Sequence, residues 1–193
     1  MPHLYIIAGC NGAGKTTASY TVLPGILNCD EFVNADNIAK GLSPFNADGV
    51  AFEAGRIMLT RINELLEAGK DFAFETTLAT RSYVAFIKKA KAAGYETHLI
   101  FFFLNSIELA KLRVEQRVQE GGHNIPPEVI ERRYKAGIRN FNLLYKDVVD
   151  DWRLYDNSNL NRALIAEMDK SRGLNVINEE IFRKFVQHGK ASF

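Results

Sequence analysis

The hydrophobic and polar positions of the chain follow two periods in turn, which predict alternating strands and helices. Short apolar runs predict strands at His3 to Ala8, Glu31 to Ala35, Phe72 to Phe74, His98 to Leu104 and Arg153 to Tyr155, and Ala163 to Glu167 is a candidate for a further short strand. Apolar residues three to four positions apart predict helices at Lys15 to Leu23, Asp48 to Glu67, Tyr83 to Ala93, Ile107 to Glu120, Glu128 to Tyr145 and Glu179 to Gln187. Because strands alternate with helices, we expect a three-layer α/β fold whose mostly parallel five-stranded sheet binds ligands at the carboxyl ends of its strands.

A complete phosphate-binding loop, Gly9 to Thr16, directly follows the first predicted strand. Its glycines allow successive backbone N–H groups to line one concavity that binds anions. We expect Lys15 to contact the β- and γ-phosphates of a nucleoside triphosphate and Thr16 to bind Mg²⁺ through its hydroxyl. The expected nucleotide contacts are Asn11, Gly12, Ala13, Gly14, Lys15, Thr16 and Thr17. A glycine-rich hairpin with a surface lysine is the alternative, but the strand before the loop and the helix after it favour binding of ATP with Mg²⁺.

Two acidic residues end predicted strands on the same edge of the sheet as this loop. Asp36 is the candidate base that orients an acceptor hydroxyl toward the γ-phosphate and accepts its proton. Glu75 is the candidate for ordering the water shell of Mg²⁺, and Thr77 beside it is a candidate for contact with phosphate or substrate. The alternative for each carboxylate is a cap on the helix that follows it.

The two predicted helices of residues 107–140 form a hairpin with the properties of a lid. Arg113 and Arg117 lie four positions apart on one helix face, and Arg133 lies near the start of the next helix. Closure of such a lid would bring guanidinium groups to the transferred phosphoryl group and exclude water. For each arginine, a solvated helix face paired with an acidic neighbour such as Glu131 stays open as the alternative.

Composition and charge limit the classes of function. A formal net charge of +1 gives no reason to expect a nucleic-acid or membrane partner, and an apolar content of 47% favours a globular fold, which we expect to be a single domain over residues 1–193. The chain starts without the pattern of a secretory signal, so we expect it in the cytoplasm. Cys10 and Cys29 are its two cysteines, which indicate neither a disulfide framework nor a zinc site.

With these motifs in this order, residues 4–158 resemble the zeta toxin family of P-loop kinases. The resemblance rests on the loop Gly9 to Thr16, on Asn34-Ala35-Asp36, on Phe74-Glu75-Thr76-Thr77 and on Arg113-Val114-Glu115. It implies an ATP-dependent kinase in which Asp36 acts as base on a sugar hydroxyl of UDP-N-acetylglucosamine, with an antitoxin protein as a partner. It also implies a substrate site formed by Asp36, Glu75, Thr77, Arg81 and Arg133.

The chain departs from the family pattern in the half that would bind the acceptor. A second substrate-binding acid of the family falls near Leu59, a loop arginine falls near Ala79 with Arg81 two positions later, and a lid arginine falls near His123. The sequence therefore predicts the phosphoryl donor better than the acceptor. A nucleotide-dependent switch and an ATP-binding module without an acceptor stay open as alternatives, although the chain lacks the Asn-Lys-x-Asp segment that reads guanine.

Overall fold

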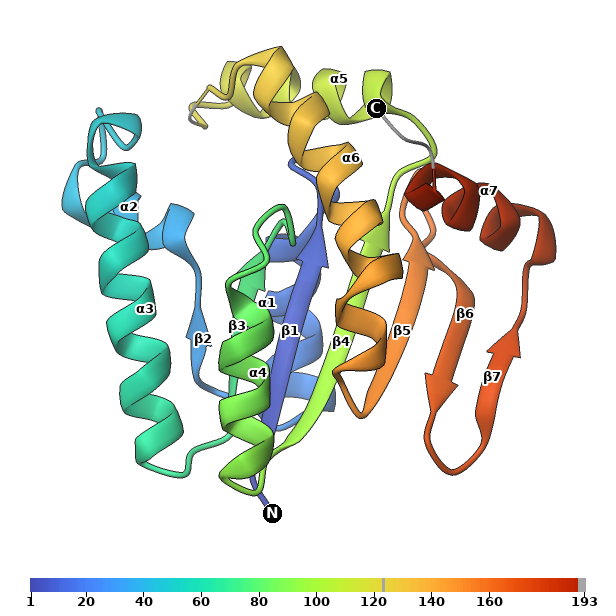
Figure 1. Ribbon diagram of the computed structural model, residues 1–193. Coiled ribbons are helices and arrows are strands. Elements are labelled where there is room, and N and C mark those ends of the chain that lie inside the picture. Colours follow the sequence, from blue (N-terminus) through green and yellow to red (C-terminus); the bar gives the residue numbers. More distant parts are fainter. Residues whose placement is uncertain (123, 191–193) are drawn as a thin grey trace.

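The computed structural model describes residues 1–122 and 124–190, and in these residues seven strands form one twisted sheet (Figure 1). The strands are β1 (His3–Gly9), β2 (Phe32–Val33), β3 (Phe72–Thr76), β4 (Glu96–Phe103), β5 (Asp151–Asp156), β6 (Ala163–Asp169) and β7 (Gly173–Val176). Their order across the sheet is β2-β3-β1-β4-β5-β6-β7. The neighbours from β2 to β5 are parallel, whereas β6 and β7 are antiparallel to the strands that they join.

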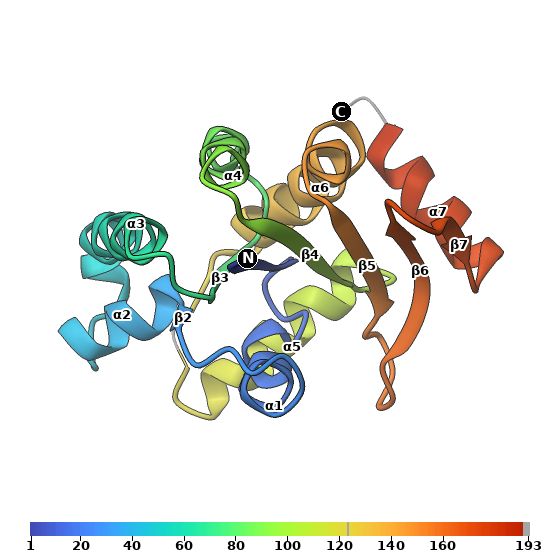
Figure 2. The same cartoon turned by 90° about the horizontal axis from the view of Figure 1, so that it is seen from below.

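Helices cover both faces of the sheet, which confirms the predicted three-layer α/β fold. They are α1 (Lys15–Ile26), α2 (Ala35–Leu42), α3 (Ala51–Glu67), α4 (Tyr83–Ala92), α5 (Ile107–Gln119), α6 (Pro127–Leu143) and α7 (Glu179–Lys190), with short 3₁₀ helices at Asp48–Val50 and Tyr145–Asp147. Figure 2 shows α4 and α6 on one face and α1 and α5 on the other. No helix in the described part of the chain has both the length and the apolar character needed to cross a bilayer.

The prediction of five strands is wrong in number, because two antiparallel strands extend the sheet beyond β5. The candidate strand at Ala163 to Glu167 is real and forms most of β6. The sequence analysis missed β7, since three of its four residues are exposed and it has no apolar period. At the other edge, β2 is shorter than predicted because Asn34 already caps a helix.

The core lies at the centre of the sheet, where β1 and β4 are almost fully buried. Phe101, Phe141 and Phe185 meet there from β4, α6 and α7, with ring centroids 5.2 to 5.4 Å apart. Each fully buried phenylalanine contributes about 1.5–3 kcal/mol to folding. These contacts hold the central strands in a fixed register, and the carboxyl end of β1 presents the phosphate-binding loop.

Candidate active site

The phosphate-binding loop turns sharply where β1 ends, and the turn requires glycine. Gly9 has φ +141°, and a Cβ built on it would lie 2.4 Å from the carbonyl oxygen of Phe102. Gly12 has φ +79°, and its Cβ would lie 2.8 Å from the carbonyl oxygen of Ala110. Side chains at these positions would collide with backbone. The loop therefore keeps its backbone open toward an anion at the start of α1.

A buried cluster of polar side chains joins the loop to the end of β3. Lys15 Nζ lies 3.4 Å from Glu75 Oε1, with side chains only 6% and 10% exposed, and it also donates to the carbonyl oxygen of Cys10 at 3.0 Å. The hydroxyl of Thr16 donates to Glu75 Oε2 at 2.7 Å. A hydroxyl oxygen and a carboxylate oxygen at this separation are the hard donors that Mg²⁺ prefers. The two residues predicted as metal ligands thus lie in direct contact.

Asn34 holds this cluster together, and the sequence analysis assigned it no role. Its Nδ2 donates to Glu75 Oε2 at 2.7 Å and to the Thr16 hydroxyl at 3.3 Å. Its Oδ1 accepts from the backbone N–H groups of Asp36 and Asn37 at 2.8 and 3.1 Å, which makes it the N-cap of α2. The sequence held one signal for this role, because asparagine is a favoured N-cap and Asn34 stands between a strand and a helix.

The N-cap at Asn34 decides the alternatives for the two carboxylates. Asp36 lies in the first turn of α2 and is not its cap, so that alternative is wrong. Glu75 contacts the phosphate-binding loop, whereas α4 begins at Tyr83 without a side-chain cap, so that alternative is wrong as well. Both carboxylates lie at the carboxyl edge of the sheet, Glu75 near the end of β3 and Asp36 at the start of α2.

A cavity of about 320 Å³ brings together residues that the sequence placed in the site on separate grounds. Lys15, Asp36, Glu75, Thr77 and Arg133 all line it. These residues come from α1, α2, the end of β3 and α6. The cavity therefore lies at the edge of the sheet that carries the phosphate-binding loop, between helices from the two faces of the sheet. Two cationic side chains, Lys15 and Arg133, and two carboxylates, Asp36 and Glu75, therefore line one cavity.

Arg133 reaches the cavity from α6 and donates to Asn11 Oδ1 of the phosphate-binding loop at 3.2 Å. Burial lowers the pKa of this guanidinium, and the nearby Asp36 carboxylate opposes that effect. A largely desolvated guanidinium has more to gain from an anionic ligand than an exposed one. Arg133 thus contacts the phosphate-binding loop and lines the cavity, and its role in binding a ligand remains a prediction.

The remaining predicted arginines lie outside the described lining of this cavity. Arg113 donates to the carbonyl oxygens of Asn157 and Ser158 at 2.7 and 2.9 Å, while Asn157 Nδ2 donates to Ala13 of the loop at 2.8 Å. Arg113 therefore supports the phosphate-binding loop indirectly, through Asn157. Arg117 is half-buried in the last turn of α5, and Arg81 is exposed before α4. Their roles in transfer remain predictions.

The helix α6 of the predicted lid hairpin packs into the core. Tyr134 donates to the carbonyl oxygen of Leu104 at 2.7 Å, and Asn140 Nδ2 donates to that of Leu78 at 2.7 Å. Glu131, proposed as a partner for arginines, pairs instead with Lys111 and Lys135 at 3.1 and 2.9 Å. The lid over residues 107–140 remains a prediction, and its turn residue His123 lies outside the described residues.

Leu59 and Ala79 are the positions where the resemblance implied an acid and an arginine. Leu59 is 47% exposed on α3, whereas its neighbour Met58 lines the cavity. Ala79 also lines the cavity, where an arginine side chain would add a positive charge.

Cys10 is a buried residue of the phosphate-binding loop. Burial raises the pKa of its thiol to about 11, so Cys10 is a neutral packing residue.

A second, larger hollow of about 940 Å³ lies between β2 and α3, and Asn34 lines both it and the cavity. Glu53 and Arg56 contribute charge to this groove, whereas Phe52 and Ile57 contribute apolar surface. The cavity at the phosphate-binding loop is thus lined by several charged side chains, whereas the adjoining groove has both charged and apolar side chains.

A phosphate-binding loop at the end of β1, a carboxylate in contact with that loop, and a mostly parallel sheet between helices define a P-loop kinase fold. The family model described as Zeta toxin matches residues 1–167, so the chain belongs to the zeta toxin family. This confirms the resemblance drawn from the motifs. An uncharacterized protein of Haemophilus influenzae is 29% identical over 126 residues, which are 65% of this chain and 88% of that protein.

Solved structures share the fold at low sequence identity. A chain of the AvrRxo1-ORF1:AvrRxo1-ORF2 complex with sulphate ions matches all of this chain with a TM-score of 0.76 and 18% identity. The same complex with ATP matches with a TM-score of 0.75 and 17% identity. A chain of the PezAT toxin–antitoxin system of Streptococcus pneumoniae matches 98% of this chain and 85% of its own length, with a TM-score of 0.68 and 15% identity. This chain spans 66% of the AvrRxo1 chain.

Proposed function

We propose that the protein is a kinase that transfers the γ-phosphoryl group of ATP to a hydroxyl group of a small molecule. The observation that carries the proposal is the single cavity in which Lys15 of the phosphate-binding loop, Asp36 and Arg133 face one another. The fold by itself is also compatible with a nucleotide-dependent switch or with a module that binds ATP without an acceptor. A carboxylate and a half-buried guanidinium in the same cavity as the phosphate-binding lysine support phosphoryl transfer to an alcohol.

The residues have complementary roles in this reaction. Asp36 orients the acceptor hydroxyl and accepts its proton as the oxygen bonds to the γ-phosphorus and ADP leaves. Lys15 and Arg133 offset the negative charge that spreads over the transferred group. Thr16 and Glu75 would hold Mg²⁺, which neutralises charge on the β- and γ-phosphates when it is bound. Arg113 and Arg117 would join the site if the helical hairpin closes.

The acceptor differs from the sugar nucleotide of the family, or binds it by other contacts. Met58 and Tyr83 form an apolar wall of the cavity, and Arg133 supplies the cation that Ala79 lacks. We therefore propose an acceptor with a hydroxyl near Asp36 and an anionic group near Arg133. UDP-N-acetylglucosamine remains a candidate acceptor, because its uridine portion could extend past Asn34 into the groove between β2 and α3.

A screen of hydroxyl-bearing metabolites with ATP and Mg²⁺ tests the proposal, with UDP-N-acetylglucosamine among them. A mass gain of one phosphoryl group identifies the acceptor. Asp36→Asn should lower the transfer rate at least about 100-fold and leave ATP affinity unchanged. Asp30→Asn, an exposed aspartate before β2, is the matched control. Full transfer by Asp36→Asn would refute the base, and ADP release without any product would favour a switch.

We also propose a partner protein that blocks the ATP site. The support is that a chain of the PezAT toxin–antitoxin system shares the fold. Expression of the active protein should then arrest growth, and Lys15→Ala should abolish the arrest. Growth that continues normally at full expression of active kinase would count against a toxin that needs such a partner.

A further inference from the structure

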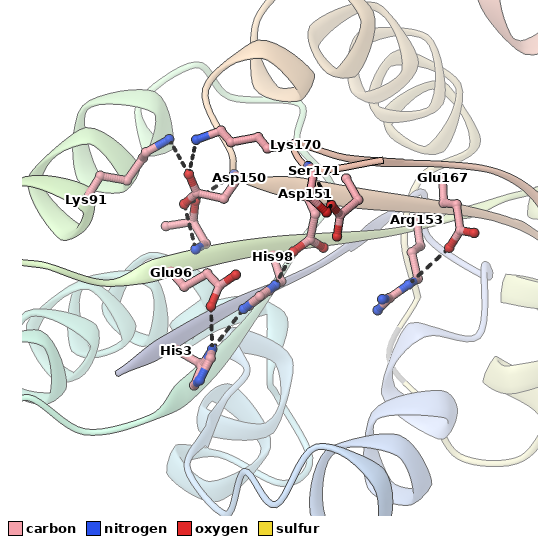
Figure 3. A network of polar contacts seen from close by, with 12 residues as sticks. His3, Lys91, Glu96, His98, Asp150, Asp151, Arg153, Glu167, Lys170 and Ser171 are labelled. Atoms are coloured by element: carbon pink, nitrogen blue, oxygen red, sulfur yellow. Dashed lines mark hydrogen bonds and ion pairs between the residues drawn. The ribbon is translucent and has the colours of Figure 1, made fainter. Parts of the chain in front are cut away.

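The end of the sheet farthest from the phosphate-binding loop gathers a second set of functional side chains, which the kinase reaction does not use (Figure 3). His3 begins β1, whereas the loop follows the other end of the same strand. The distance along seven residues of a strand is about 20 Å. Any ligand bound at His3 is therefore separate from the Mg²⁺ expected at Thr16.

Strand register brings the cluster together from distant parts of the sequence. In the parallel pair β1 and β4, His3 lies opposite Glu96 and Tyr5 lies opposite His98. In the pair β4 and β5, His98 lies opposite Asp151. Because side chains two positions apart share a face, all of these side chains lie on one face of the sheet.

Three of these residues direct donor atoms at one point. His3 Nδ1 lies 3.0 Å from His98 Nε2 and 3.7 Å from Glu96 Oε2, and all three donor atoms lie within 4.8 Å of one another. For a tetrahedral ion with bonds of about 2.0–2.1 Å, donor atoms are about 3.3 Å apart. The two observed separations lie on either side of that value. Among the described residues, this is the one group of three such side chains placed to share an ion.

An outer carboxylate orients the histidine at the centre. His98 Nδ1 lies 2.5 Å from Asp151 Oδ2. An ionised carboxylate can only accept, so the proton of His98 resides on Nδ1 and the lone pair of Nε2 points toward His3. A carboxylate behind a ligating histidine is the usual support of a protein zinc site. Stacking of Tyr5 on His98, with ring centroids 4.9 Å apart, fixes the plane of the ring.

We propose that His3, His98 and Glu96 bind one divalent transition-metal cation of the zinc type, with Asp151 as the positioning residue for His98. Two imidazole nitrogens and one carboxylate oxygen suit such ions, whereas Mg²⁺ prefers oxygen donors alone. His3 and Glu96 are 34% and 38% exposed, so an ion can enter and a water molecule can complete the coordination.

The ion would tie together the first residues of three neighbouring strands. β1 contributes His3, β4 contributes Glu96 and His98, and β5 supports them through Asp151. Because an ion that binds only the folded chain stabilises it, Zn²⁺ should raise the melting temperature of the protein.

Equilibrium dialysis of the full chain against Zn²⁺, without nucleotide, tests this proposal. We expect one ion per chain, retained in excess Mg²⁺, and loss of that ion in the double variant His3→Ala/His98→Ala. Asp151→Asn should weaken binding about 10–100-fold while leaving one site. His188→Ala, an exposed histidine on α7, is the matched control and should bind as the unchanged protein does.

A second measurement separates metal binding from a simple hydrogen bond between the two histidines. Co²⁺ in a tetrahedral site gives visible absorption, which should appear with the unchanged protein and be absent from the double variant. Circular dichroism of the variants shows whether they fold. Failure of the unchanged protein to bind Zn²⁺, or equal binding by a folded double variant, would overturn the site, and neither result bears on the kinase proposal.

Discussion

The charge pair beneath the phosphate-binding loop makes a quantitative prediction for Glu75→Gln. The substitution keeps the shape of the side chain and removes its charge, so Lys15 is left buried at 3.4 Å from a neutral amide. Both side chains are at most 10% exposed, which means that little solvent screens the loss. Breaking a buried ion pair from one side costs about 3–5 kcal/mol. Because Lys15 keeps its hydrogen bond to the carbonyl oxygen of Cys10, we expect the lower end, about 3 kcal/mol.

Thermal unfolding measures this cost directly. For a chain of this size, about 3 kcal/mol corresponds to a fall of roughly 6–12 °C in melting temperature. ATP without Mg²⁺ should recover more stability in Glu75→Gln than in the unchanged protein, since its phosphates return a negative charge to Lys15. The double variant Lys15→Met/Glu75→Gln should melt close to the unchanged protein, because it leaves no buried charge.

Glu64→Gln is the matched control for the charge change. Glu64 pairs with Arg61 at 3.4 Å on the surface, with side chains 56% and 45% exposed, and such pairs contribute little. A Glu75→Gln protein that melts within about 2 °C of the unchanged protein would show that the pair is solvated, and the reasoning from burial would fail.

Three further predictions concern the loop, the cap and the opposite end of the sheet. Gly9→Ala should abolish measurable ATP binding, because its Cβ would lie 2.4 Å from the Phe102 carbonyl oxygen. Asn34→Asp keeps an N-cap but replaces the donor to Glu75 with a second buried carboxylate, so both phosphoryl transfer and the melting temperature should fall, transfer by about tenfold or more. Asn34→Ala should lose about 1 kcal/mol of stability through the missing cap. Asp150→Asn should destabilise the protein most above about pH 5. Burial raises the pKa of Asp150, but hydrogen bonds from Lys170, Lys91 and Thr97 have a larger effect and hold that pKa well below its usual value.

Each of these predictions has an outcome that contradicts it. Normal ATP binding by Gly9→Ala would mean that the loop relaxes at no cost. Equal activity of Asn34→Asp and the unchanged protein would remove Asn34 from the site. For Asp150, a lowered folded-state pKa gives stability that is complete above the unfolded pKa, near 4, and is lost as the pH falls toward the folded value. The stability difference from Asp150→Asn should therefore shrink below about pH 4, and a gap that grows there would refute the assignment.

The residues that the sequence placed at one edge of the sheet were found from local pattern. Gly9 to Thr16 specifies its own turn, since glycine and lysine spacing within eight residues decides the backbone and its charge. Asp36 and Glu75 were placed at strand ends, and parallel strands bring their carboxyl ends to one edge. The family model then confirmed what these motifs indicated.

The residues that the sequence analysis missed act through contacts across the fold. Asn34 was assigned no role, and its hydrogen bond to Glu75 joins positions 41 residues apart. The strand β7 lacks an apolar period because its side chains are mostly exposed, and only pairing with β6 makes it a strand. The cluster at His3 and His98 spans 95 residues and depends on strand register alone.

The sequence by itself predicted the phosphate-binding loop and a mostly parallel sheet between helices, because spacing within a segment sets backbone conformation and charge. The tertiary structure decided which side chains share a cavity, that Asn34 unites the cap of α2 with the carboxylate of Glu75, and that two histidines meet a glutamate at the far end of the sheet. The physical reason is that hydrogen bonds and metal coordination act over about 3 Å, and only the packed sheet brings residues this distant in sequence within that range.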